Sequence, residues 1–147
     1  MDQVFIESTP FNPWQRLQDY QLARFGDSAA YGAVSSFVGT MRDFNEGDDV
    51  TEMFLEHYPG MTENYLRNII QQARARWDVI DCLIMHRVGT ITPADTIMLT
   101  AVWSAHRREA FEAGRYLVEE LKHHAPFWKK ETLVSGDVRW VETNTPG

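Results

Sequence analysis

The sequence predicts an α+β fold from two observations. Apolar residues recur at helical spacing in three segments, which begin near residues 13, 62 and 105. Around these segments lie short stretches rich in Val, Ile, Phe and Thr, the composition of strands. The chain has 147 residues, 44% of them hydrophobic, which is enough for one domain with its own core. We therefore expect a single domain over residues 1–147. Residues 1–30 have the fewest sequence patterns that indicate structure.

The first thirty residues predict a short strand and one helix. The strand is expected at residues 4–7. Asn12 followed by Pro13 is a helix N-cap with proline at the first helical position, and Gly26 suits the position after the helix end. Four apolar residues of the helix are expected to pack on one side: Trp14, Leu17, Leu22 and Phe25.

Residues 31–41 predict a buried strand that delivers Arg42 to its end. The DFNEGDD segment that follows is polar, which predicts a surface loop. Its carboxylates could suggest a metal site. However, their spacing lacks the calcium-loop pattern and solvent exposure explains them more simply, so no metal site is predicted. Residues 50–58 predict another strand, and the turn after it leads to a helix capped by Thr62.

Residues 79–88 and 96–103 predict two antiparallel strands joined by the GTITPAD turn. Cys82, the only cysteine, falls in the first strand, which excludes an intrachain disulfide and makes this residue a poor carrier of sulfur. The adjacent His86 and Arg87 must point to opposite faces of the strand, so at most one of them lines a cleft. We assign His86 a structural role.

A third helix is expected between Ser104, a good N-cap residue, and Pro126, which ends it. Its apolar residues share one face, which predicts a core contact: Ala110, Phe111, Gly114, Leu117, Val118 and Leu121. An aromatic loop follows Pro126. After it, residues 133–134 and 138–141 predict a hairpin, and residues 143–147 predict a flexible tail.

Cations lie at both ends of this third helix. At its start, His106 and Arg107 fall where the helix dipole already favours an anion. They either bind one, or the arginine is solvated and the histidine bonds a carbonyl. At its end, three ammonium groups come within a short reach, those of Lys122, Lys129 and Lys130. Either the dipole simply favours them there, or crowding lowers the pKa of a lysine enough for acid–base chemistry.

Charge excludes some classes of function. The net charge of −7 argues against a general nucleic-acid binder, because phosphate backbones require a basic surface. Six of the 14 Lys and Arg residues lie between residues 107 and 130, which suits a local anion site. No apolar run approaches the roughly 18 residues of a membrane span, and the N-terminus lacks the pattern of a signal peptide. We expect a cytoplasmic protein.

Five separated motifs occur in the order of one known family. They are FVGTMRDFNEG (37–47), LEHYPGM (55–61), SAHR (104–107), FEAG (111–114) and LK followed by APFWKKE (121–131). Together they resemble the large catalytic subunit of molybdopterin synthase, over roughly residues 30–142. The sequence departs from the family at Thr40, where relatives can carry a basic residue. It also departs at GDVRWVE, which has one residue more than the family spacing.

The resemblance implies an α/β-hammerhead-type core with an additional small antiparallel β subdomain. It implies a sulfurtransferase of molybdenum cofactor biosynthesis that converts cyclic pyranopterin monophosphate (precursor Z) to the dithiolene molybdopterin. Sulfur would come from the thiocarboxylated Gly-Gly end of a small ubiquitin-like subunit. The chain would form a homodimer within a heterotetramer, with pocket residues drawn from both copies. Both reactants are substrates, so no cofactor is expected.

The same resemblance assigns residue roles. Two residues would act on the partner's tail: Lys122 and Lys129. Basic residues would bind the pterin phosphate: Arg42, His106 and Arg107, with Arg139 as a weaker candidate. Apart from the resemblance, we expect Lys130 either to contact the substrate or to be only a solvated neighbour, and Phe37 and Glu131 to support the pocket.

Two other functions remain open from the sequence. One is a non-catalytic module that docks the tail of a ubiquitin-like protein, with the cations serving affinity alone. The other is an enzyme acting on a different phosphorylated heterocycle, which would turn over with no protein partner present.

Overall fold

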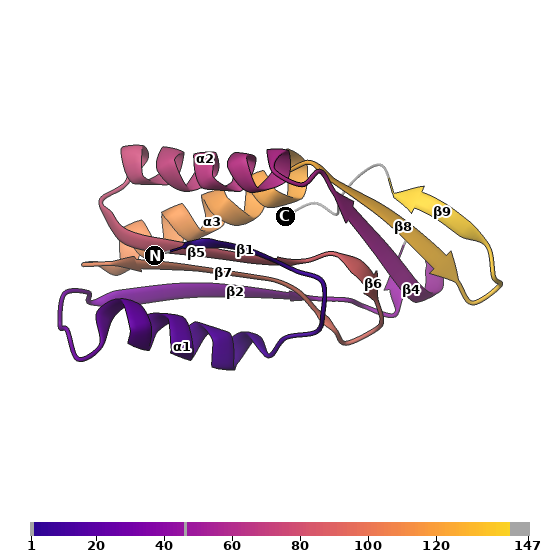
Figure 1. The fold of residues 1–147 in the computed structure, drawn as a ribbon, viewed down its shortest axis with the longest axis horizontal. Helices are drawn as coiled ribbons and strands as arrows, with labels where there is room; N and C mark the ends of the chain where they lie inside the picture. The colour runs from indigo at the N-terminus through magenta and orange to yellow at the C-terminus, as the bar shows by residue number, and fades with distance from the viewer. Residues whose placement is uncertain (1, 46, 142–147) are drawn as a thin grey trace.

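The computed structural model describes residues 2–45 and 47–141. Its central sheet has the order β1-β5-β7-β2 and consists of β1 (Val4–Glu7), β5 (Val79–Arg87), β7 (Thr96–Ser104) and β2 (Ala33–Thr40). Strand β1 is parallel to β5, whereas β5–β7 and β7–β2 are antiparallel. One face of this sheet carries α1 (Pro13–Phe25), and the other carries α2 (Met61–Arg76) and α3 (Arg107–His123) (Figure 1).

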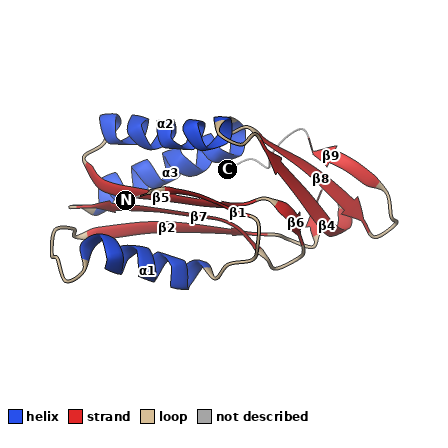
Figure 2. Ribbon diagram, viewed as in Figure 1, coloured by secondary structure: helices blue, strands red, loops and turns tan. Residues whose placement is uncertain are grey.

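A second sheet extends from one end of the central sheet (Figure 2). It has the order β3-β4-β8-β9 and contains β3 (Phe44–Asn45), β4 (Asp48–His57), β8 (Phe127–Leu133) and β9 (Val138–Val141). Strand β6 (Gly89–Ile91) pairs with Met53, Phe54 and Leu55 of β4 on the edge opposite β8. The predicted α+β fold, with a small antiparallel sheet beside the main one, is confirmed.

Apolar side chains fill both faces of the central sheet, because β5 and β7 are covered by helices on each side. On β5, Cys82 and Ile84 pack toward α2 and α3, while Leu83 and Met85 pack toward α1. Strands buried on both faces have continuous apolar runs, as the sequence of β5 does. This also explains why Cys82 is fully buried, as predicted.

Several local predictions hold. The side chain of Asn12 caps α1 by accepting hydrogen bonds from the N–H groups of Trp14 and Gln15, at 3.0 and 3.3 Å. Strands β5 and β7 pair in antiparallel fashion as expected. The packing face of α1 is narrower than predicted, because Trp14 and Leu22 are each 62% exposed.

Two predicted helix caps are wrong, because each hydroxyl bonds elsewhere. Ser104 is the last residue of β7, and its Oγ donates to the carbonyl of His106, the actual N-cap residue of α3, at 2.5 Å. Thr62 lies inside α2. Its Oγ1 accepts from the Tyr58 N–H at 2.9 Å and donates to the Pro126 carbonyl at 3.1 Å. Thr62 therefore ties α2 to the segment that precedes β8.

Two predicted loops are strands. The acidic segment after Arg42 contains β3 and the start of β4, which pair as a hairpin. The segment after Pro126 is β8, which begins at Phe127 and pairs with β4 over most of its length. The hairpin predicted from residue 133 thus starts earlier and continues into β9. The predicted flexible tail at residues 143–147 lies outside the described residues.

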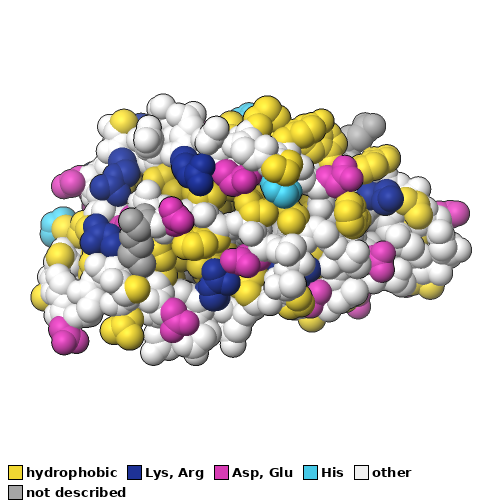
Figure 3. All heavy atoms as spheres, in the orientation of Figure 1, with side chains coloured by type: hydrophobic (Ala, Val, Ile, Leu, Met, Phe, Trp, Pro, Cys, Tyr) yellow, Lys and Arg dark blue, Asp and Glu magenta, His cyan; other side chains and the backbone are white. Residues whose placement is uncertain are grey.

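Charges of both signs alternate on the surface. On the face drawn in Figure 3, Lys and Arg side chains are scattered among Asp and Glu side chains. Hydrophobic side chains gather there where α2 meets β4 and β8, a region that contains the exposed Tyr58, Met61 and Trp128. Within residues 2–45 and 47–141, no helix is both long and apolar enough to cross a membrane.

Candidate active site

Three cavities lie around the C-terminal part of α3, and Lys122 lines all of them. The large cavity, of about 570 Å³, is also lined by Arg42. Two smaller cavities, of about 120 and 170 Å³, are lined by both Lys122 and Lys129. We call these two together the lysine pocket. Arg42 also lines the smaller of them, so three cations border this one cavity.

The large cavity lies between the edge strand β2 and one side of α3. Phe37 lines it from β2, Thr100 from β7, and Phe111, Val118 and Lys122 from α3. The last three residues are spaced by seven and four positions, so they form one stripe along the helix. A neighbouring stripe holds the residues of α3 that are buried in the core: Ala110, Ala113, Leu117 and Leu121.

The prediction that Phe111 belongs to the core is therefore wrong. Its side chain is 66% exposed and lies in the wall of the large cavity. The predicted apolar face was in fact two adjacent stripes, of which one packs on the sheet and the other faces the cavity.

Burial and mutual repulsion shape the electrostatics of the lysine pocket. Burial lowers the pKa of Lys122, and the charge of Arg42 lowers it further. Burial also lowers the pKa of Lys129, as do the charges of Lys122 and Arg42, while Glu131 acts in the opposite direction. Both amines therefore release a proton more readily than a lysine in water.

Successive side chains of β8 point to opposite faces of the strand, and this decides which lysines lie near each other. Lys129 and Glu131 are two residues apart and line the same cavity, whereas Lys130 points to the other face of the strand. The Lys130 ammonium lies 5.9 and 5.7 Å from the ring centroids of Phe54 and Trp140. The structure thus brings together two of the three lysines and leaves Lys130 outside the pocket.

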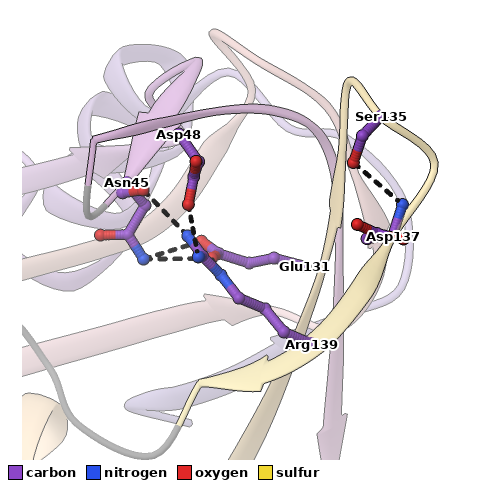
Figure 4. Close-up of polar contacts among 6 residues, drawn as sticks. All are labelled: Asn45, Asp48, Glu131, Ser135, Asp137 and Arg139. Carbon is purple, nitrogen blue, oxygen red and sulfur yellow. Dashed lines mark hydrogen bonds and ion pairs between the residues drawn. The ribbon is translucent and has the colours of Figure 1, made fainter.

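Arg139 is held in a polar network at the far side of Glu131 (Figure 4). Its Nε donates to Glu131 at 3.2 Å, its Nη1 to Asp48 at 2.9 Å and its Nη2 to the Asn45 carbonyl at 2.9 Å. Asn45 also donates to both carboxylate oxygens of Glu131 at 3.1 Å. The guanidinium therefore fixes the second sheet around Glu131, and the described lining of the three cavities does not include it.

His106 and Arg107 lie at the opposite end of α3 from Lys122. Lys122 is fifteen positions after Arg107, which corresponds to about 22 Å along a helix. Both side chains are exposed to solvent. Within one chain the predicted phosphate-binding residues are therefore split, with Arg42 beside the lysines and His106 and Arg107 far from them.

Sequence reasoning missed several residues that line the cavities. Ser35, Ser36 and Thr100 line the large cavity, and their signal was the presence of polar residues within otherwise apolar strands. His86 was assigned to structure, yet it lines the lysine pocket. Its signal was a histidine placed at the end of a buried strand.

Comparison with known proteins agrees with this architecture. The MoaE protein family matches residues 7–124. A molybdopterin synthase catalytic subunit from Ralstonia nicotianae is 57% identical over 111 residues, which are 76% of this chain and 62% of that protein. The matched region thus spans less than two thirds of that relative.

Solved structures share the fold. The crystal structure of molybdopterin synthase from Staphylococcus aureus has a TM-score of 0.83 at 30% identity, and the match covers 96% of this chain and 98% of that chain. A complex of subunits 1 and 2 of molybdopterin-converting factor from Helicobacter pylori has a TM-score of 0.79 at 19% identity, covering 98% and 93%. The chain belongs to the MoaE family of molybdopterin synthase catalytic subunits.

Proposed function

We propose that this chain is the catalytic subunit of a molybdopterin synthase. It converts cyclic pyranopterin monophosphate to molybdopterin with sulfur from the thiocarboxylated C-terminus of a small ubiquitin-like subunit. The observation that carries the proposal is that Lys122, Lys129 and Arg42 line one cavity, and that Lys122 and Arg42 also line the large cavity. Membership of the family supports the same chemistry. A cytoplasmic location belongs to this proposal.

The lysine pocket receives the tail of the partner. A thiocarboxylate is an anion, and the ammonium groups of Lys122 and Lys129 offer it charge and N–H donors. Because burial lowers the pKa of both lysines, each exchanges a proton at lower cost than a solvated lysine does. Glu131, buried beside Lys129 and fixed by Asn45, keeps that lysine in place.

The large cavity receives the pterin. Its volume of about 570 Å³ suits a small heterocycle, and Phe37 and Phe111 offer apolar walls. Arg42 lies at its junction with the lysine pocket, where a guanidinium binds a phosphate with two parallel hydrogen bonds. The pterin therefore lies beside the sulfur donor instead of in a separate site.

A second copy of the chain supplies His106 and Arg107. Arg107 lies about 22 Å along α3 from Lys122 of its own chain, at the helix spacing of 1.5 Å per residue, and His106 precedes it. The large cavity opens at β2, which is an edge strand with exposed Val34 and Phe37. A homodimer formed at this edge brings the cations of one copy toward the cavity of the other. A small subunit on each copy completes a heterotetramer, and the complex of two subunits in Helicobacter pylori supports such a partner.

Reconstitution tests the proposal. The purified chain, cyclic pyranopterin monophosphate and a thiocarboxylated small subunit are combined, and the dithiolene product is measured beside a Lys122→Ala control. We expect product from the wild type and none from the control. A folded wild-type chain that binds the small subunit without forming product would contradict catalysis and favour a docking module. Turnover without the small subunit would contradict the sulfur source.

A further inference from the structure

His86 is a part of the lysine pocket to which the proposed function gives no role. It lies near the end of β5, only 6% exposed, in a cavity that Lys122 lines from α3 and Lys129 from β8. Its ring stacks on Phe127, with centroids 4.0 Å apart and planes inclined by 15°. The stacking fixes the plane of the imidazole.

The hydrogen bond of His86 decides which ring nitrogen carries the proton. Its Nδ1 lies 2.8 Å from the carbonyl oxygen of Arg87. A carbonyl only accepts, so Nδ1 donates, and in the neutral ring Nε2 is then an acceptor. Since Nδ1 points back to the backbone of its own strand, Nε2 lies on the opposite side of the ring, and the ring lines the cavity that Lys122 and Lys129 also line.

The surroundings keep this ring uncharged. Burial lowers the pKa of His86 to about 4, and the charges of Lys122, Lys129 and His57 act in the same direction. The titratable groups that face it are Lys122 and His123 of α3, Lys129 of β8 and His57 of β4. At neutral pH the ring contributes an acceptor to a pocket of cations and adds no further positive charge.

We propose that His86 is a positioning residue of the lysine pocket, whose Nε2 accepts a hydrogen bond from a lysine ammonium and so fixes where that lysine presents its other N–H groups. The inference rests on the proposed sulfur transfer. An ammonium has three donors, so a bond from one of them to His86 fixes the directions of the other two. A neutral imidazole suits this place because a charged group of the same sign would repel the lysines.

Two substitutions separate positioning from packing. His86→Phe retains an aromatic ring against Phe127 but removes the acceptor, and His86→Gln retains an acceptor at about the reach of Nε2. With a saturating thiocarboxylated small subunit, we expect His86→Phe to lower the single-turnover rate about tenfold, and His86→Gln to stay within about threefold. Loss of the acceptor destabilises the ammonium, so the limb of the pH–rate profile set by the lysine shifts to lower pH in His86→Phe.

Met85→Ala is the control, because Met85 is the buried neighbour on the opposite face of β5. It lowers the thermal midpoint while the pH–rate profile stays in place. The inference is overturned if His86→Phe keeps the wild-type rate and profile. It is also overturned if the single-turnover rate falls equally in both His86 variants and the pH–rate profile does not shift. A residue that serves packing alone would give that result.

A spectroscopic test does not depend on either His86 variant folding. In ¹⁵N-histidine-labelled protein bound to the small subunit, we expect the His86 ring as the Nδ1–H tautomer, neutral from pH 7 down to about 5. An Nε2–H tautomer would overturn the inference. A wild-type chain without product would contradict the proposed function itself, whereas an active wild type with an unaffected His86→Phe contradicts only the role of His86.

Discussion

The two ends of α3 carry cations in opposite surroundings. At the C-terminal end, Lys122 is half-buried beside Arg42, and its pKa is lowered. At the N-terminal end, His106 and Arg107 are exposed to solvent. The first end forms a site within one chain because β8 and the loop after β2 close around it. At the second end, the described lining of the three cavities includes neither residue. The pKa of a cation on α3 therefore depends on which neighbouring elements desolvate it, and not on the helix dipole alone.

Among these substitutions, Lys122→Ala should reduce sulfur transfer the most. We expect sulfur transfer to fall by about 10³-fold, because the substitution removes the amine shared by all three cavities. Single-turnover rates with the thiocarboxylated subunit give the effect, and calorimetry gives partner affinity. A rate near wild type would contradict the assignment, and parallel loss of rate and affinity would favour docking.

Adjacent lysines of β8 provide the next contrast. We expect Lys129→Ala to reduce the rate by about 10²-fold and Lys130→Ala to stay within about twofold, because only Lys129 faces the pocket. Both substitutions remove one positive charge, so the pair is matched in charge and position. Equal losses from the two variants would show that general charge, and not the face of the strand, sets the rate.

The folding stability of the chain also depends on pH through His86, which lines a cavity beside the C-terminal end of α3. The pKa of His86 is about 4 in the folded chain and 6.5 without burial, so the unfolded chain binds a proton first as pH falls. The stability contributed by the neutral ring is therefore present above pH 6.5 and is lost toward pH 4. Urea unfolding of wild type and His86→Gln should diverge by about 3 kcal/mol over this window. Parallel curves would contradict a buried neutral histidine.

Arg107→Ala tests the exposed end. Loss of a charge-assisted contact to the pterin phosphate should raise KM about tenfold with little change in kcat. Arg108→Ala is the control, since Arg108 is also exposed and pairs with Glu112 at 3.3 Å. Steady-state kinetics over a range of pterin concentrations gives both constants. A loss confined to kcat would contradict a role in substrate binding.

Cys82→Ala should have the smallest effect on transfer. The thiol is fully buried, and burial, with the charge of Asp81, raises its pKa to about 12. A thiol in this state is a poor nucleophile. We expect product formation within about twofold of wild type, and slow alkylation of Cys82 in the native chain. Loss of product in a folded Cys82→Ala variant would point to sulfur carried on the chain itself.

The sequence predicted the elements whose signals are local. The cap of α1 at Asn12 and the continuous apolar run of β5 depend on neighbouring residues, and both are found. Strand β8 escaped prediction because a proline and two lysines resemble a loop, and its pairing partner β4 lies about seventy residues earlier. Long-range pairing decides such strands more than local composition does.

The sequence predicted which residues form the candidate site better than it predicted where their side chains lie. Lys122, Lys129 and Arg42 were all expected at the site and do line one cavity. The positions of Lys130 and Arg139 required knowledge of strand faces and of partners on other strands, Glu131 and Asp48 among them. The separation of the two cation groups by the length of α3 did follow from the sequence, because both groups flank one predicted helix.

Mixed dimers test most directly whether the two ends of α3 act together across two copies. Lys122→Ala and Arg107→Ala chains are each assayed alone and after random mixing, at a pterin concentration below KM. If each site joins Lys122 of one copy to Arg107 of the other, half of the dimers contain one intact site, and activity recovers to roughly a quarter of wild type. Activity that stays at the average of the two variants would contradict a shared site.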